Sequence, residues 1–208
     1  MTSTDPPDLH VWIGGSPCSG KSTVAQQLAA LLGWSLYTCD DHWDDHVRRG
    51  TRSWEPVLIK LGDLPIEVRL RQGLEIQVAD VFEAYREEFP LIRADLADAT
   101  LPTVVEGAAL LPDLLATAGV PASSAVWLVP TEEFQRAHYA RRGWARNLLV
   151  GISDADDLFE TWMRRDAAFG RLVALQARDL GYRVITVDGS ASAESVFADV
   201  ADGLSKAS

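Results

Sequence analysis

Residues 14–23 read Gly-Gly-Ser-Pro-Cys-Ser-Gly-Lys-Ser-Thr, and this stretch decides the fold. It contains the phosphate-binding pattern G-x-x-x-x-G-K-[ST], filled by Gly15, Gly20, Lys21 and Ser22. The two glycines let the backbone curl around a phosphate with several N–H groups pointing inward. The lysine brings positive charge to the outer phosphates, and the serine hydroxyl can bind the Mg²⁺ of a nucleoside triphosphate.

The sequence on either side of this loop supports the same interpretation. Residues 9–13 are a short, mostly apolar run, and Val24, Leu28, Leu31 and Leu32 follow at helical spacing. Strand, glycine-rich loop and helix is the arrangement that the chemistry requires, because the helix adds its positive end to the phosphate site. We therefore expect ATP and Mg²⁺ as cofactors. The expected ATP-binding loop residues are Gly15, Ser16, Cys18, Ser19, Gly20, Lys21, Ser22 and Thr23.

Length and composition are those of one globular domain. The chain has 208 residues, of which 47% are hydrophobic and 24% charged, and that length can bury a core without disulfides or metals. The formal net charge is -11, whereas a protein that grips nucleic acid usually presents a basic face. We expect a single domain over residues 1–208 whose partner is a small molecule and not a nucleic acid.

Cysteine use and the N-terminal sequence favour a cytoplasmic protein. The two cysteines, Cys18 and Cys39, form neither a metal-binding pattern nor a disulfide framework. Residues 1–8 are polar and proline-rich, which predicts a disordered lead without a targeting signal. No apolar run approaches the length of a membrane span, so we expect no membrane association. The sequence leaves the oligomeric state open.

Predicted strands and helices alternate along the chain, which indicates an α/β fold with a parallel sheet covered on both faces. The expected strands lie at 9–13, 34–39, 103–106, 125–129 and 183–187. Ligands of such sheets bind beyond the C-terminal strand ends, which here carry Gly14, Asp40, Glu106, Pro130 and Asp188.

Helix boundaries follow from proline, glycine and capping residues. We expect a helix over 65–89 with Pro90 beyond its end, and a further helical turn over 94–100. Thr131 should cap a helix that Gly143 interrupts. Ser153 and Asp156 resemble a capping box at the start of the next helix.

Three short motifs resemble the P-loop small-molecule kinases of the nucleoside and nucleotide kinase superfamily. Besides the phosphate loop, residues 40–43 (Asp-Asp-His-Trp) are similar to the acidic end of strand two in uridine kinase and nicotinamide riboside kinase. Residues 104–107 (Val-Val-Glu-Gly) are similar to the end of the middle strand in the same enzymes. The resemblance implies the three-layer P-loop fold with strand order 2-3-1-4-5, a helical acceptor-binding insertion over residues 41–100 and an arginine-bearing lid over 136–152.

Asp40 follows Lys21 by 19 residues, room for one helix and one returning strand. A carboxylate held beside the transferred phosphoryl group can take the proton of an acceptor hydroxyl or order the Mg²⁺ shell. Both roles remain open for Asp40, and Asp41 is an alternative base. An aspartate-rich turn without catalytic function fits the same residues.

Glu106 emerges directly from a buried strand, which is costly for a carboxylate unless it is paired or bound to a metal's waters. We therefore predict Ser22, Asp40 and Glu106 as the groups around Mg²⁺. A partly exposed residue at the strand end is the plainer explanation.

Arginines near residues 136–152 suit phosphate oxygens, because a planar guanidinium matches their geometry. Arg141, Arg142 and Arg146 flank Gly143 and Trp144, and the glycine is a candidate hinge. We predict Arg142 and Arg146, with Lys21 and Asp40, as catalytic groups and Arg141 as an ATP ligand. Arg164 and Arg165 either join this site or only pair with Glu160 and Asp166, and an exposed basic helix in an acidic protein is the alternative for the whole set.

The long segment between strands two and three should bind the acceptor. Its candidate contacts are His42, Trp43, Arg48, Arg52, Trp54 and Arg69. His42 and His46 are spaced like a metal pair, but no third ligand matches them, so zinc is not predicted.

These observations predict an ATP-dependent kinase that phosphorylates a hydroxyl of a small molecule such as a nucleoside or sugar. A nucleoside monophosphate kinase, whose acceptor is itself a phosphate, is the first alternative. A nucleotide-gated regulatory module that transfers no phosphate is the second, although it would need neither Asp40 nor the lid arginines.

Overall fold

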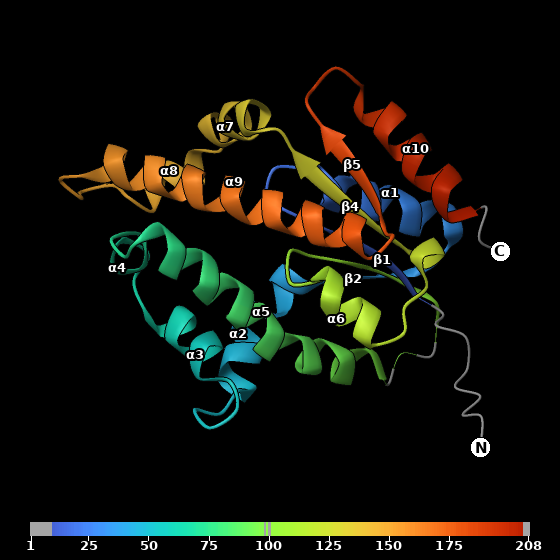
Figure 1. Ribbon diagram of the computed structural model, residues 1–208, viewed down its shortest axis with the longest axis horizontal. Coiled ribbons are helices and arrows are strands. Elements are labelled where there is room, and N and C mark those ends of the chain that lie inside the picture. Colours follow the sequence, from blue (N-terminus) through green and yellow to red (C-terminus); the bar gives the residue numbers. More distant parts are fainter. Residues whose placement is uncertain (1–9, 98, 100, 206–208) are drawn as a thin grey trace.

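A five-stranded parallel sheet forms the centre of the protein (Figure 1). The computed structural model describes residues 10–97, 99 and 101–205. The strands are β1 (His10–Gly15), β2 (Ser35–Thr38), β3 (Thr103–Glu106), β4 (Ala125–Pro130) and β5 (Arg183–Val187). Their order, β2-β3-β1-β4-β5, confirms the predicted 2-3-1-4-5 arrangement and the α/β class.

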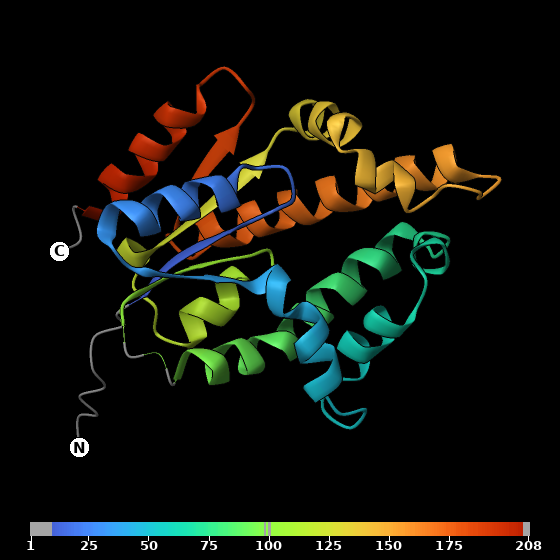
Figure 2. The ribbon, with the colours of Figure 1, turned by 180° about the vertical axis from the view of Figure 1, so that it is seen from behind.

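Helices cover both faces of the sheet, giving three layers (Figures 1 and 2). One face carries α1 (Lys21–Leu32) and α10 (Ala193–Ser205), whose Val24, Leu28 and Val200 pack on Val11 and Ile13. The other carries α6 (Pro112–Thr117), the C-terminal half of α5 (Leu74–Ala97) and α9 (Ala155–Asp179). Successive β1 side chains alternate between the two cores, as the strand's period of two requires.

The predicted acceptor segment is helical. It begins with α2 (Cys39–Arg49), continues through α3 (Pro56–Asp63) and α4 (Ile66–Leu70), and returns along α5. Figure 1 shows these helices together below α9, beside the sheet. Asp40 and Asp41 occupy the first turn of α2, where a helix N-terminus favours negative charge.

The predicted lid region follows β4. Thr131 caps α7 (Glu132–Arg141) by accepting a hydrogen bond from the Phe134 N–H, as expected. The chain then breaks at Arg142, and the short helix α8 (Gly143–Asn147) begins at Gly143. Gly143 therefore starts a helix, and the residue before it makes the bend. A 3₁₀ turn, η1 (Ala122–Ser124), precedes β4.

Two predicted helix boundaries are wrong. Pro90 lies inside α5, which continues to Ala97. The cost of an interior proline, roughly 3 kcal/mol, is offset because the helix beyond it buries Ile92 and Leu96 in the core. The capping box at Ser153 does not form either: α9 begins at Ala155, and the Asp154 carboxylate instead accepts hydrogen bonds from Arg71.

Some expectations concern residues that the structure leaves out. The disordered lead at 1–8, and residues 98 and 100 of the expected turn over 94–100, lie outside the described residues. Across the described part of the chain, no helix combines the length and the apolar character that a membrane crossing demands.

A buried histidine ties α2 to α5. The side chain of His46 is fully buried, and its ring nitrogens lie 2.9 Å from Glu88 Oε1 and 2.9 Å from Asp95 Oδ2. Tyr37 donates a hydrogen bond to the same Asp95 oxygen. Burial alone would lower the pKa of His46, but the hydrogen bonds that its ring donates to the carboxylates of Glu88 and Asp95 outweigh burial and raise the pKa. Burial acts against Asp95 too, yet its hydrogen bonds to His46, Tyr37 and Arg49 lower its pKa to about 2.

We expect His46→Gln to destabilise the protein by about 3–5 kcal/mol near pH 5.5, because Glu88 loses its buried partner. The His46 contribution is complete below its unfolded pKa of 6.5 and fades as pH rises through the higher folded value. The Asp95 contribution is complete above 3.8 and fades as pH falls toward 2. Urea denaturation at pH 5.5 and pH 8.5 should therefore give a larger loss at the lower pH. His138→Gln serves as the control, and a loss equal at both pH values would contradict the charged-histidine assignment.

Candidate active site

The phosphate loop contains three residues with positive φ, a backbone conformation that favours glycine. Gly15 has φ +131°, and a Cβ there would lie 1.9 Å from the Leu128 carbonyl oxygen of β4. Gly20, with φ +82°, precedes Lys21 at the start of α1. Cys18 has φ +66°, the one positive φ outside glycine in the described part of the chain. Strain of this kind costs about 1–3 kcal/mol and concentrates at functional sites.

Buried polar atoms around the loop lack partners. Ser16 Oγ, Ser19 Oγ and Glu106 Oε2 are buried, and no described group forms a hydrogen bond with them. Native proteins satisfy nearly all such groups, so unpaired ones need an explanation. Their gathering at one loop is the pattern expected where a phosphate group and its ions bind.

Glu106 lies at the C-terminal end of β3, opposite Ile13 of β1 and Thr38 of β2. The glutamate is 2% exposed, and burial raises its pKa. The positive charge of Lys21 and a hydrogen bond from the Ser22 hydroxyl act in the opposite direction and favour the carboxylate. The prediction that Glu106 is buried is confirmed, and the alternative of a partly exposed residue at the strand end is wrong.

These residues fit a magnesium ion. Ser22 and the unpaired Glu106 Oε2 supply oxygen, the ligand type that Mg²⁺ prefers, and Mg²⁺ usually keeps several waters and nucleotide oxygens. In the described residues no three His, Cys, Asp or Glu side chains are placed to hold a metal by themselves. The site therefore fits an ion delivered with a nucleotide better than a protein-only metal site.

A cavity of about 450 Å³ lies between residues of the predicted acceptor segment and Arg165 of α9, and Trp144 of α8 also lines it. Asp40 and Asp41 line one side of it. The charges of Asp40 and Asp41 both raise the pKa of Glu106, and Asp40 has the larger effect. The other lining residues are Trp43, Asp44, Leu61, Arg69, Gln72, Gln77, Asp80, Val81, Tyr85, Trp144 and Arg165.

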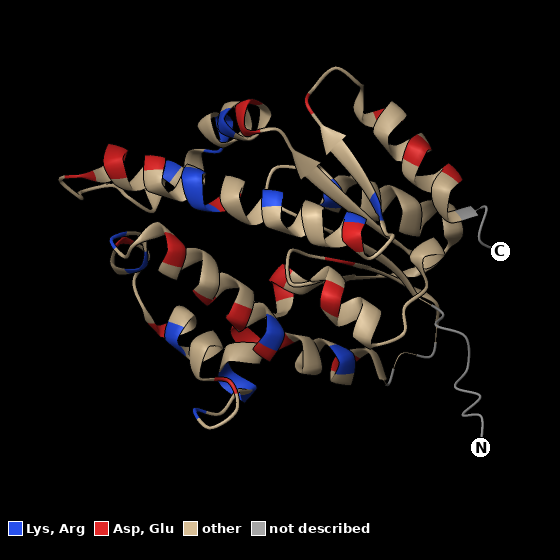
Figure 3. Cartoon of the chain, viewed as in Figure 1, with Lys and Arg blue, Asp and Glu red and all other residues tan. Residues whose placement is uncertain are grey.

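Two arginines enter this cavity from different helices, Arg69 from α4 and Arg165 from α9. Figure 3 shows basic residues both on α4 and on the adjoining half of α9. Arg165 Nε and Nη2 donate to Asp166 Oδ1 at 2.9 and 2.7 Å. Asp166 Oδ2 accepts from Tyr139 at 2.7 Å and from Trp162 at 3.1 Å. Arg165 is thus held rigidly, whereas Arg69 makes no ion pair with a described residue.

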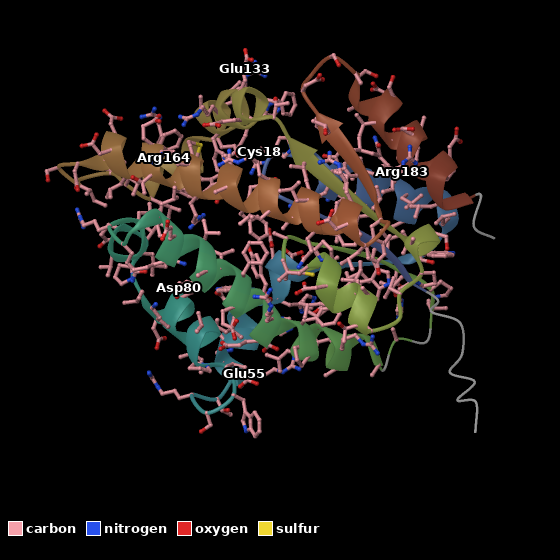
Figure 4. The ribbon with its side chains drawn as sticks, in the orientation of Figure 1. Cys18, Glu55, Asp80, Glu133, Arg164 and Arg183 are labelled. Atoms are coloured by element: carbon pink, nitrogen blue, oxygen red, sulfur yellow. The ribbon has the colours of Figure 1, made fainter. Side chains whose placement is uncertain are left out.

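The predicted lid arginines occupy different surroundings. The Arg142 guanidinium lies 5.7 Å from the Tyr139 ring centroid, and its charge reaches Cys18 in the phosphate loop. Arg146 pairs with Asp156 at 3.1 Å and lies 4.7 Å above the Phe159 ring, so it is engaged away from the loop. Arg141 is exposed. Arg164, labelled in Figure 4, lies on α9, across from the labelled Asp80 on α5.

Most other predicted acceptor contacts lie outside the cavity. Arg48 pairs with Asp45 and Arg52 with Asp63 on the surface, and Trp54 is 80% exposed. His42 stacks on Tyr37 with ring centroids 4.3 Å apart. Of the six candidates, only Trp43 and Arg69 line the cavity.

Sequence reasoning missed Tyr85 and Trp144 as cavity residues. Tyr85 lies on the apolar face of α5, and its spacing marks it only as core. Burial and the charge of Asp40 raise its pKa, and Arg165 opposes the rise, so the ring lies near both. Trp144 adjoins the lid arginines, but nothing in its sequence surroundings distinguishes a cavity wall from a surface aromatic.

Comparison with known proteins bears on the fold. No protein-family model matches the chain, and no match is found among curated proteins. A shikimate kinase from Acinetobacter baumannii, solved with shikimate, matches with TM-score 0.51 and 13% identity over 95% of this chain and 93% of that chain. A shikimate kinase from Aquifex aeolicus matches with TM-score 0.40 and 18% identity over 95% and 97%. With the strand order, the first of these shows that the chain has the fold of P-loop small-molecule kinases.

We expect Lys21→Ala to remove stabilisation by Mg-ATP, because the loop loses its charge toward the outer phosphates. At 100 times the dissociation constant, a ligand stabilises by about 2.7 kcal/mol, and most of this should disappear. Thermal melting with and without Mg-ATP measures the effect. Lys60→Ala, on α3, is the matched control, and equal stabilisation of the Lys21 variant by Mg-ATP would exclude this loop as the phosphate site.

Proposed function

We propose that the protein transfers the γ-phosphoryl group of ATP to a hydroxyl group of a small molecule. One observation supports the proposal: Asp40 lines the cavity, and its charge also acts on Glu106, the buried carboxylate that Lys21 and the Ser22 hydroxyl stabilise. An acceptor in this cavity would present its hydroxyl between a carboxylate and the end of the nucleotide.

The proposed reaction assigns each group a role. The acceptor oxygen forms a bond to the γ-phosphorus while the bond from that phosphorus to the β–γ bridging oxygen breaks, leaving ADP. Asp40 receives the proton of the attacking hydroxyl. Lys21 and the loop N–H groups hold the phosphate oxygens in line for the transfer. Bound Mg²⁺ would neutralise phosphate charge, with Ser22 and Glu106 holding it, directly or through water.

The lid arginines complete the proposed site. Arg142 is the one of the three whose charge acts on Cys18 of the loop. Arg146 would need to leave Asp156 to reach a nucleotide, and Arg141 is free to move because it is exposed. Their roles as phosphate ligands belong to a closed state, which lid motion would reach after ATP binds.

A nucleoside monophosphate kinase is the second candidate, because Arg69 and Arg165 put positive charge in the acceptor cavity. Reaction with γ-labelled ATP and a panel of nucleosides, sugars and nucleotides separates the possibilities. Label on an alcohol supports the first proposal, and label on a phosphate supports the second. Slow release of phosphate without any transfer would favour a nucleotide-gated module.

We expect Asp40→Asn to lower kcat by about 10²–10⁴, because a positioned base contributes that much to proton removal. The affinity for ATP should change little. Measuring kcat across a Mg²⁺ titration distinguishes the alternatives. Recovery at high Mg²⁺ would mean that Asp40 orders the metal, and a small loss at every Mg²⁺ level would point to a phosphate acceptor or to Asp41 as the base.

We expect Arg142→Ala to lower kcat about 10²–10³-fold and to weaken ATP binding less, since the arginine would meet charge that develops during transfer. Arg146→Ala should behave similarly if the lid closes over the nucleotide. Steady-state kinetics with ATP and acceptor varied separately test both. Arg178→Ala, at the far end of α9, is the control, and a raised ATP KM with unchanged kcat would remove the arginine from the lid site.

A further inference from the structure

Arg69 is a half-buried cation whose Nε atom is buried and has no hydrogen-bond partner. Burial, and next the positive charge of Arg165, lower its pKa. The charge of Glu67 opposes this shift without reversing it, and no ion pair joins Arg69 to a carboxylate among the described residues. Bringing two guanidinium groups together in a partly buried cavity is unfavourable unless an anion joins them.

The charges nearby do not balance this pair. Asp166 neutralises one positive charge through Arg165, and its own two oxygens are fully used by Arg165, Tyr139 and Trp162. Arg69, Arg165 and Asp166 together therefore carry about one net positive charge where the two arginines line the cavity. Arg165 is already oriented by Asp166, so an anion would find one guanidinium fixed in place and a second unpaired beside it.

The cavity is also lined by carboxylates, which would favour a cationic ligand where the arginines favour an anionic one. Four aspartates line the same cavity: Asp40, Asp41, Asp44 and Asp80. Asp80 is already paired with Lys60, and the other three are exposed, so water solvates them at little cost even though they could attract an amine. The Arg69 Nε is buried, and an unsatisfied buried donor costs about 1–3 kcal/mol. The arginine pair therefore has the stronger requirement for a partner.

We propose that the acceptor carries an anionic oxyacid group, a carboxylate or a phosphate monoester, that binds between Arg69 and Arg165. The inference rests on the proposed function, because it describes the acceptor of that reaction. Tyr85 lies near both Asp40 and Arg165, so the body of the acceptor would rest against its ring. Trp43 and Trp144 supply further aromatic wall. The hydroxyl to be phosphorylated then lies at the Asp40 end and the anion at the arginine end.

Binding measurements test this without requiring turnover. The probes are hydroxy acids paired with their methyl esters, and sugar or nucleoside monophosphates paired with the free sugar or nucleoside. Calorimetry is carried out on the full chain with a non-hydrolysable ATP analogue and Mg²⁺. We expect the acidic member of at least one pair to bind about 10- to 100-fold more tightly, the worth of a charge-assisted contact. The preferred set of pairs identifies the anion as carboxylate or phosphate.

Variants then assign the preference to Arg69. Arg69→Gln should abolish the preference for the acid, and Arg69→Lys should restore part of it by charge alone. The affinity for the ATP analogue should stay within about twofold of the wild-type value. Arg52→Gln removes an exposed arginine of the same segment and should leave every affinity unchanged.

The outcomes are distinct. Equal binding of acid and neutral members, or tighter binding of amine-bearing probes, would overturn the inference. Equal weakening of the ATP analogue and the acid by Arg69→Gln would overturn it too, since Arg69 would then be a nucleotide ligand. If the acids bind through Arg69 but no label moves from ATP, the anion site stands and the kinase proposal fails.

Discussion

A carboxylate buried at the end of the central sheet is the constraint on which the site depends. Glu106 is almost inaccessible to water, and only Lys21 and Ser22 at the start of α1 compensate its charge. The next residue, Gly107, lies so close to Cys39 that a Cβ would approach the cysteine Cβ to 2.5 Å. Since α2 begins at Cys39, this close approach places Asp40 near the end of β3, where Glu106 lies. One buried charge and one missing side chain thus connect the start of α1 to the start of the predicted acceptor segment.

The nucleotide half was predictable because local sequence determines it. A loop with two obligatory glycines, a lysine and a hydroxyl has few structural solutions, and the strand before it and the helix after it follow from spacing. In a parallel sheet the C-terminal strand ends meet at one edge, so Glu106 and Asp40 could be placed near Lys21 from their positions in the chain. The predicted ends of β3 and β5 match the structure, and the other three predicted strand ends lie within two residues of the observed ones.

The acceptor half was predictable only in outline, because long-range packing decides it. From the sequence, His46 had no role beyond a metal spacing that lacked a third ligand, whereas the structure pairs it with Glu88 and Asp95, 42 and 49 residues away. Pro90 looked like a helix end, yet burial of the residues beyond it continues the helix. Arg69 and Arg165 are 96 positions apart in sequence, and only the packing of α4 against α9 places them in one cavity.

Asp166 connects the predicted lid to the cavity, because side chains of both regions depend on its carboxylate. Its carboxylate holds Arg165 at the cavity and also accepts from Tyr139, the ring beneath Arg142. Trp144, in the helix after Arg142, lies 6.4 Å from the Tyr139 ring and itself lines the cavity. Tyr139 is therefore a contact shared by Arg142 and by the carboxylate that orients Arg165. Because both arginines depend on the surroundings of Asp166, a change at this carboxylate should disturb the cavity and the predicted lid together.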